Sequence, residues 1–267
     1  MPYHRFEDYK ARAHAIHLTT AQNRKIEGRY MFFCHVTKAA GTGSELHYHP
    51  NELLAFVVHG TANIIVGMDR RMAPAGTFVH IPPNARHSIK ATEEQDMQYL
   101  YIKDQTWSMV GVAEDEALPD EAPDVEEVAK QFAAGDWPGG EKDPENSSAI
   151  LEGLGNCFYP TIEGFDSSTV SLNRTRRVEG ERLAFEFADL STGAEITRPK
   201  TDHEEFMYLI KGNIQANVAG EKKACEPGDV LEIPRGSELS IKVTKGRARS
   251  ASVISMPYLE EKIDTKK

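Results

Sequence analysis

Residues 47–60 read HYHPNELLAFVVHG and carry two histidines, two residues apart, at the start of an apolar run that ends in glycine. The run has the length and composition of a β-strand. Side chains alternate between the two faces of a strand, so His47 and His49 share one face with Leu53. Glu52 points to the opposite face. Two imidazoles on one face can both reach a single point inside a narrow barrel.

Two blocks of short apolar runs, from residue 28 to about 103 and from about 183 to 255, are separated by a different middle part. The runs lack a sustained 3.6-residue period, and their regular spacing predicts a sandwich or barrel in each block. The middle part, residues 113–148, is acidic and rich in Pro and Gly. Within it APDVEEVAKQFAAG (122–135) predicts a short helix that Gly135 ends. We interpret this part as an inter-domain connection, with a lid over a site as the alternative.

The two blocks repeat each other at a constant offset of 152 residues, the separation of Gly60 from Gly212. The other matching positions are Gly76 and Gly228, and Ile81-Pro82 and Ile233-Pro234. The flanking text agrees, with ELLAFVVHG against EFMYLIKG and PAGTFVHIP against PGDVLEIP. We infer two copies of one β-barrel fold.

These motifs resemble those of the cupin superfamily. The family pattern is H-x-H with a downstream glycine, followed by P-x-G, a short strand, I-P and a final histidine; here it reads HYH, Gly60 and PAGTFVHIPPNARH. The resemblance implies an all-β bicupin, two tandem double-stranded β-helix (jelly-roll) barrels with a short helical linker. We therefore expect an N-terminal barrel with a metal site at 1–110, a linker at 111–150, and a C-terminal barrel at 151–267.

Three histidines of the first block are candidate metal ligands: His47, His49 and His87, which follows the Ile81-Pro82 turn. Nitrogen ligands of this kind suit Fe(II), Mn, Ni, Cu or Zn. The family usually has a carboxylate or amide where this chain has Leu53, which cannot ligate. Glu52 becomes a fourth ligand only if the strand bulges. We expect a three-histidine site.

The second block lacks most of these ligands. The offset places Pro199, Thr201 and Leu239 at the three histidine positions. Glu205 occupies the position of Leu53, and His203 aligns close by, so these two form at most a vestigial site. We expect one metal per chain and a structural or dimerising second barrel.

Further residues are candidates to line the first cavity, although packing or a solvated surface explains several of them equally well. Besides Leu53, they are Cys34, His35, Gln98, Tyr99, Tyr101 and Arg29. Tyr99 and Tyr101 alternate along one strand, so they can face the cavity together. Arg29 would meet an acidic substrate.

The net charge argues against some classes of binding partner, and the cysteine content indicates the redox compartment. Lys and Arg total 31 against 41 for Asp and Glu, a net charge of −10 that argues against nucleic acid or an anionic membrane. Three cysteines without a CxxC pair fit a reduced compartment. The chain shows no signal peptide at its start and no apolar stretch of spanning length. We expect a cytoplasmic protein, and a homodimer.

Three neutral ligands on Fe(II) leave three of six positions open for a chelating substrate and O2. Because no protein carboxylate offsets the metal charge, a small anionic substrate is favoured. The layout resembles that of three-histidine cupin dioxygenases, which implies an Fe(II) dioxygenase cleaving an anionic aromatic or dicarbonyl compound. One alternative is an isomerase or decarboxylase that uses Mn, Ni or Zn. Another is a ligand-binding or regulatory bicupin without catalysis.

Overall fold

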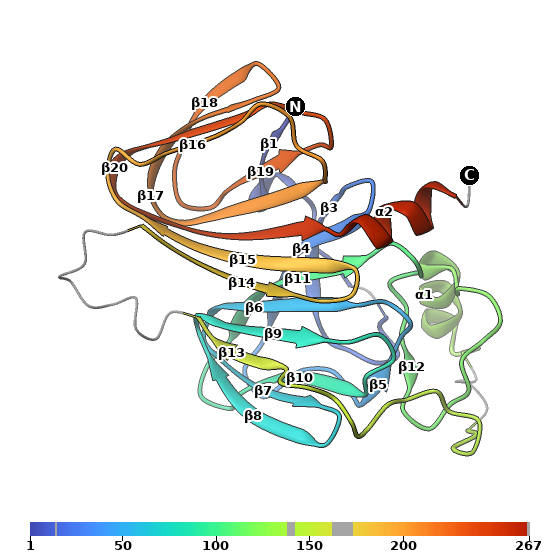
Figure 1. Cartoon of the computed structure of the whole chain (residues 1–267). Helices are drawn as coiled ribbons and strands as arrows, with labels where there is room; N and C mark the ends of the chain where they lie inside the picture. Colours follow the sequence, from blue (N-terminus) through green and yellow to red (C-terminus); the bar gives the residue numbers. More distant parts are fainter. Residues whose placement is uncertain (14, 138–141, 162–172, 266–267) are drawn as a thin grey trace. The chain divides into compact units, whose positions relative to one another are not determined.

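β-Strands are the predominant secondary structure of the described chain, as the sequence predicts (Figure 1). The structure, a computed structural model, describes residues 1–13, 15–137, 142–161 and 173–265. Two α-helices are described, α1 (Val125–Ala134) and α2 (Pro257–Asp264). Among the described residues, no helix has the length and apolar character needed to cross a bilayer.

The strands of the first half are β1 (Tyr3–Arg5), β2 (Arg12–Ala13), β3 (Gln22–Glu27), β4 (Met31–Lys38), β5 (His47–Tyr48), β6 (Leu53–His59), β7 (Thr61–Val66), β8 (Asp69–Pro74), β9 (Thr77–Ile81), β10 (His87–Ala91), β11 (Met97–Asp104) and β12 (Val112–Ala113). Those of the second half are β13 (Phe158–Pro160), β14 (Arg174–Glu179), β15 (Leu183–Leu190), β16 (Glu195–Arg198), β17 (Glu205–Val218), β18 (Glu221–Cys225), β19 (Asp229–Ile233) and β20 (Leu239–Ser255).

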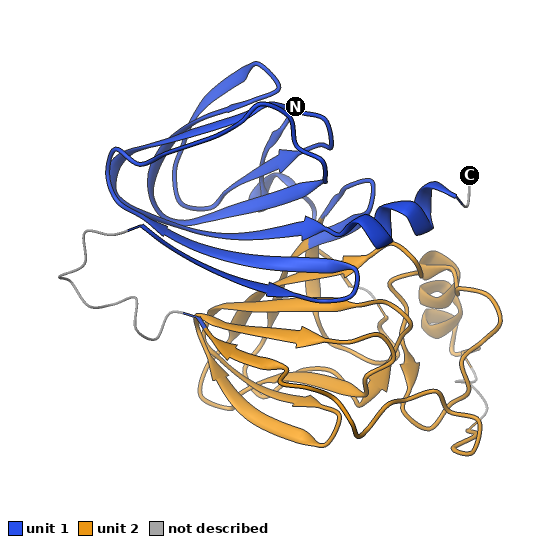
Figure 2. Cartoon of the chain, viewed as in Figure 1, with its two compact units in different colours: residues 1–10, 26–33, 161–267 blue, residues 11–25, 34–160 orange. Residues whose placement is uncertain are grey.

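The chain divides into two compact units (Figure 2). Unit 1 comprises Met1–Lys10, Ile26–Phe33 and Thr161–Lys267, and unit 2 comprises Ala11–Lys25 and Cys34–Pro160. Both contain a barrel, as expected, but the division differs from the expected boundaries of 1–110, 111–150 and 151–267. The reasons lie in strand pairing within each unit.

Unit 2 includes the segment expected to be a linker. Its strands belong to a five-stranded sheet in the order β12-β5-β10-β7-β8 and a seven-stranded sheet in the order β13-β9-β6-β11-β4-β3-β2. β12 pairs with β5, placing Val112 opposite Tyr48. β13 pairs with β9, and Ile150 N donates to Asn84 O at 2.8 Å. These backbone bonds join residues 111–160 to the first barrel.

Unit 1 takes up the chain's first ten residues. Its strands form one eight-stranded sheet, in which β1 pairs antiparallel with β19 and Tyr3 lies opposite Leu231. Arg5 Nε donates to the buried Asp229 Oδ1 at 3.0 Å. The N-terminal residues thus satisfy the backbone groups of β19, which would otherwise be a free edge of the sheet.

The internal repeat is preserved in the strand register. Leu53 lies opposite Ile81 in unit 2, and Glu205 lies opposite Ile233 in unit 1, the same pair displaced by 152 residues. Gly60 and Gly212 have φ values of 77° and 82°. A Cβ at Gly60 would lie 2.4 Å from the backbone oxygen of Asp96, and one at Gly212 would lie 2.3 Å from the backbone oxygen of Arg247. Both turns therefore require glycine.

Helix α1 begins and ends as its sequence predicts. The Asp124 side chain accepts hydrogen bonds from the backbone N–H groups of Glu126 and Glu127 and caps the N-terminus. Gly135 adopts the left-handed conformation, φ 77°, at the C-terminus. Helix α2 has a proline in its first turn but was not predicted.

Candidate metal centre

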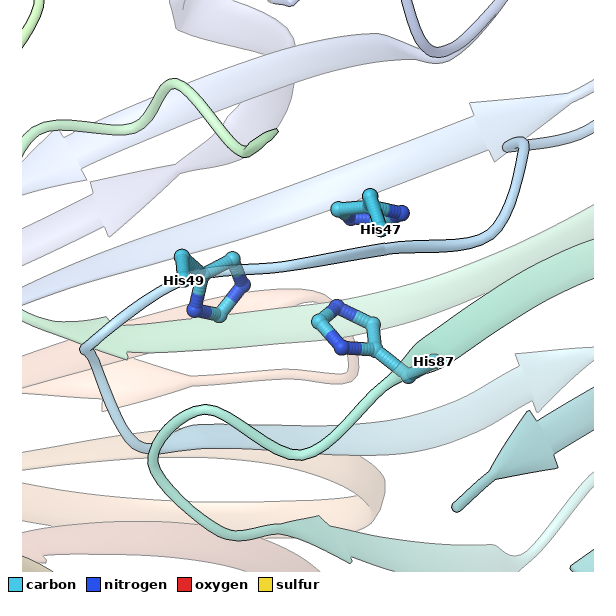
Figure 3. A group of neighbouring side chains, drawn as sticks. All are labelled: His47, His49 and His87. Carbon is cyan, nitrogen blue, oxygen red and sulfur yellow. The ribbon is translucent and has the colours of Figure 1, made fainter. Parts of the chain in front are cut away.

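Two adjacent antiparallel strands bring three histidines together in unit 2. His47 opens β5, His49 follows that strand, and His87 opens β10 directly opposite His47. Figure 3 shows the three rings turned toward one another. One possible ligand atom from each ring lies within 4.8 Å of the others.

The backbone decides which nitrogen each ring presents. The Nδ1 atoms of His47, His49 and His87 contact the carbonyl oxygens of Glu45 at 2.8 Å, Asn51 at 3.3 Å and Ala85 at 2.8 Å. A carbonyl only accepts, so each Nδ1 carries the proton and each Nε2 offers a lone pair. The Nε2 atoms of His49 and His87 are buried and have no hydrogen-bond partner within the described chain. Such orphaned lone pairs fit a metal ion, whose histidine ligands are usually oriented through the other ring nitrogen.

All three rings are neutral near pH 7. Burial, with added repulsion from neighbouring histidines and lysines, lowers the pKa of His47 and His49 well below its usual value. Burial also lowers the pKa of His87 to about 4. Because only neutral imidazole ligates, the apo site is already in its binding form.

Leu53 and Glu52 point to opposite faces of β6. Leu53 lines the cavity that contains the three histidines. Glu52 is fully buried elsewhere, with Oε1 2.6 Å from His80 Nε2, and its backbone N donates to Asp104 Oδ2 at 2.5 Å. In the described part of the chain, no carboxylate joins the histidine group.

The cavity beside the histidines has a volume of about 60 Å³. Its lining comprises Ala15, Leu18, Thr19, Ala21, Asn23, Val36, Lys38, Ser44, His47, His49, Leu53, His87, Ile89, Tyr99, Tyr101, Met109 and Gly111. The expected lining residues Leu53, Tyr99 and Tyr101 are among them. The remainder is mostly apolar, with few groups to bind a substrate.

Four residues expected at the cavity lie elsewhere. Cys34, His35 and Gln98 are not among the lining residues, and β4 instead presents Val36 and Lys38. For Gln98, the irregular register of β11 between residues 98 and 99 separates it from Tyr99. Arg29 belongs to unit 1, where its guanidinium pairs with Asp264 at 2.7 Å. Arg29 is not among the residues that line this cavity.

Two buried lysines of the site were missed by the sequence reasoning. Lys38 lines the cavity, donates to Ile89 O at 2.5 Å and lies 5.7 Å above the Tyr99 ring. Lys103 is fully buried, and its Nζ has no hydrogen-bond partner among the residues described. Burial lowers the pKa of each to about 7. The available signal was a lysine near the end of each otherwise apolar strand, MFFCHVTK and MQYLYIKD.

In unit 1, the position equivalent to Leu53 is occupied by Glu205, which belongs to an ion pair. Glu205 is fully buried and its carboxylate pairs with the guanidinium of Arg198. His203 Nε2 is 3.8 Å from Glu205, and its Nδ1 is 2.6 Å from Asp202. Arginine thus supplies the positive charge that a metal would bring, and the expected vestigial pair is an ion-pair cluster. No second metal-like group occurs in the described residues.

A family comparison agrees with this arrangement. Residues 34–103 match the model of the cupin domain. This segment, which carries the three histidines, is similar to a cupin domain. The search of curated proteins gave no match.

Solved structures of oxalate decarboxylase resemble this chain. One, concerning the Mn(II) centres of the Bacillus subtilis enzyme, is 17% identical, with a TM-score of 0.64, covering 95% of this chain and 76% of that chain. Another, of the Bacillus subtilis enzyme at pH 4.6, is 16% identical, with a TM-score of 0.64 over 95% and 75% of the two chains. A third concerns substrate binding and reaction specificity in oxalate decarboxylase and is 17% identical, with a TM-score of 0.64 over 95% and 76%. At this identity the likeness establishes the bicupin fold alone.

The comparisons give no support to an Fe(II) dioxygenase. The solved structures are of a decarboxylase, and one describes Mn(II) centres.

Proposed function

We propose that this protein is a metal-dependent enzyme that binds one divalent ion, Mn(II) in preference to Fe(II), and decarboxylates a small anionic organic acid. The observation that carries the proposal is the convergence of three neutral imidazoles in a cavity whose described lining includes Lys38 and no carboxylate. Oxalate decarboxylases of the same fold supply the reaction class.

The donor set is suited to a divalent ion and an anionic ligand together. His47, His49 and His87 would hold the ion through Nε2, and three ligands leave positions open for substrate. The bound ion would act as a Lewis acid that polarises a carboxylate or carbonyl oxygen. Since Leu53 contributes no negative charge, an anionic substrate meets no repulsion from the protein side of the site.

The cavity beside the histidines has room for a small acid. Its volume of about 60 Å³ holds roughly four water-sized groups.

The side chains have distinct roles in the proposed reaction. Leu18, Ile89 and Met109 line the cavity and limit its water content. When the C–C bond to the departing carboxylate breaks, CO2 leaves and the electron pair remains on the other carbon. That carbon then takes a proton, for which the Lys38 ammonium in the lining is a source.

Metal loading followed by product analysis tests the proposal. Protein purified without chelators is loaded with Mn(II), Fe(II) or Zn(II) and incubated with oxalate and small 2-oxo acids, while CO2 release and O2 uptake are measured. We expect CO2 release with Mn(II) and no stoichiometric O2 consumption. Stoichiometric O2 uptake by the Fe(II) form would instead support a dioxygenase. Metal binding without turnover of any acid would support a binding protein.

A further inference from the structure

Lys103 is a buried cation without an acceptor. It lies on β11 opposite Leu53 of β6, so the two side chains share the face that carries the cavity. Tyr101 and Tyr99 precede it on the same face and line that cavity. Lys103 is not itself among the residues that line the cavity, but its register places it beside Leu53, which does line it.

Within the described residues, the carboxylate of Asp104 makes no hydrogen bond to the Nζ of Lys103. Asp104 directs its side chain elsewhere, to the backbone N–H groups of Glu52 at 2.5 Å and Thr106 at 2.8 Å. Burying an ammonium group without hydrogen bonds costs several kcal/mol. A bound metal beside it would add repulsion. Burial disfavours the charged form of Lys103, and a carboxylate placed beside it would offset this cost.

A second lysine lies on the neighbouring strand of the same sheet. β4 and β11 are adjacent, and Lys38 lines the cavity from β4. One Nζ hydrogen bond goes to Ile89 O at 2.5 Å. The cation lies 5.7 Å above the ring of Tyr99, which keeps it beside the cavity. Lys38 thus brings a cationic group to the cavity lining, and Lys103 lies on the adjacent strand.

We infer that Lys103 is a specificity-determining residue that binds a carboxylate of the substrate beside the three histidines, with Lys38 as a second cationic contact. This inference rests on the proposed function and narrows its substrate class to acids with two anionic ends or an anionic end next to a carbonyl. One end meets the metal and the other meets the lysine pair. Neutral analogues of the same shape leave Lys103 unpaired and bind poorly.

Anion binding to the Zn(II)-loaded protein, chosen because the Mn(II) form is expected to turn oxalate over, tests the inference independently of turnover. Oxalate is the probe, and its neutral isostere oxamide is the comparison; both are measured by calorimetry on wild type and on Lys103→Met. We expect oxalate binding to weaken about 10- to 100-fold in Lys103→Met, the range for one charge-assisted hydrogen bond. Metal content and oxamide binding stay unchanged. Lys130→Met, an exposed lysine of α1, is the matched control and binds oxalate as wild type does.

Thermal unfolding separates a ligand-binding role from a structural one. Removing an unpaired buried charge relieves its desolvation, so apo Lys103→Met unfolds at the same or a higher temperature than wild type. If Lys103→Met does not fold, Lys103→Gln serves in its place. Wild-type oxalate affinity in the folded variant would overturn the inference even if the wild type decarboxylates acids. Lysine-dependent oxalate binding without turnover would support the inference while the proposed reaction fails.

Discussion

At the scale of single residues, three backbone carbonyls determine the chemistry of the site. Those of Glu45, Asn51 and Ala85 hold the Nδ1 protons, and the Nε2 lone pairs therefore converge. Burial keeps the rings neutral, so metal binding does not first have to displace protons near pH 7.

Removing two of these ligands should abolish metal binding. Wild-type protein is expected to hold one equivalent of metal per chain, and His47→Ala/His49→Ala close to none, because a single histidine remains. Elemental analysis after gel filtration measures both. His203→Ala is the matched control, since His203 belongs to the ion-pair cluster in unit 1 and should leave the metal content unchanged. Two equivalents in wild type would contradict the one-site geometry.

Acid should destabilise the apo protein through the same histidines. The pKa of His87 is lowered by burial to about 4, against 6.5 in the unfolded chain, so the unfolded state binds more protons between these values. The free energy of unfolding is thus independent of His87 above about pH 7 and falls as the pH drops from 6.5 to 4. The total loss from this group is about 3 kcal/mol.

Urea unfolding across this pH range checks the effect. His87→Gln should show a shallower decline of unfolding free energy with acidification than wild type, because it lacks the titrating ring. Equal slopes for the two proteins would show that His87 is not the source.

At the scale of elements, the residue before β12 packs against the metal ligand His47. Gly111 directly precedes β12, and a Cβ there would lie 2.7 Å from the Cδ2 atom of His47. Gly111→Ala should therefore displace the His47 ring and weaken metal affinity about 10-fold, a typical effect for a change behind a ligand. Gly155→Ala is the matched control, since nothing lies within 4 Å of a Cβ at that position. Titration with a competing chelator measures both affinities, and equal values would contradict this packing role.

The alternation of side chains along β6 provides a second test at this scale. Leu53→Glu places a carboxylate in the histidine cavity, so metal affinity should rise about 10-fold or more. The added negative charge should weaken oxalate binding at the same time. Glu52→Ala, on the opposite face beside His80, should keep the wild-type metal affinity while lowering stability. Loss of metal in Glu52→Ala would mean that the strand is bulged at this point.

At the scale of the whole molecule, the chain crosses between its two units more often than a tandem arrangement requires. Met1–Lys10 and Ile26–Phe33 belong to unit 1, although they precede most of unit 2 in sequence. Each barrel is thus completed by residues from elsewhere in the chain, as β1 completes the sheet at β19.

Deleting residues 2–5 should therefore destabilise unit 1 and leave the metal site intact. The deletion removes β1 and the Arg5–Asp229 ion pair, exposing the edge of β19. Limited proteolysis is expected to cleave unit 1 faster than in wild type, while the metal content stays at one equivalent. If the deletion also caused loss of metal, β1 would be needed for metal binding as well as for the stability of unit 1, which would contradict this prediction.

Local sequence patterns were sufficient to predict several features. The constant offset indicated the two-barrel repeat, and the start and stop residues indicated helix α1. Alternation along a strand indicated the shared face of His47 and His49 and the opposite direction of Glu52. It also placed Tyr99 and Tyr101 at the cavity. It failed for Cys34, because alternation identifies a face of a strand but not the depth at which that face meets a cavity. His35 lies on the opposite face of β4 from Val36 and Lys38, and Gln98 precedes an irregularity in β11.

The sequence by itself determined the repeated barrel, the candidate ligand triad and the absence of that triad from the second copy, because each depends on residue identity at short, regular spacings. Only the tertiary structure decided that Lys38 and Lys103 approach the histidines, that Arg29 pairs with Asp264, and that the first strand completes the second barrel. These features arise from pairing between strands far apart in the chain. Such pairing depends on register and on the burial of whole sheet faces, which no local pattern encodes.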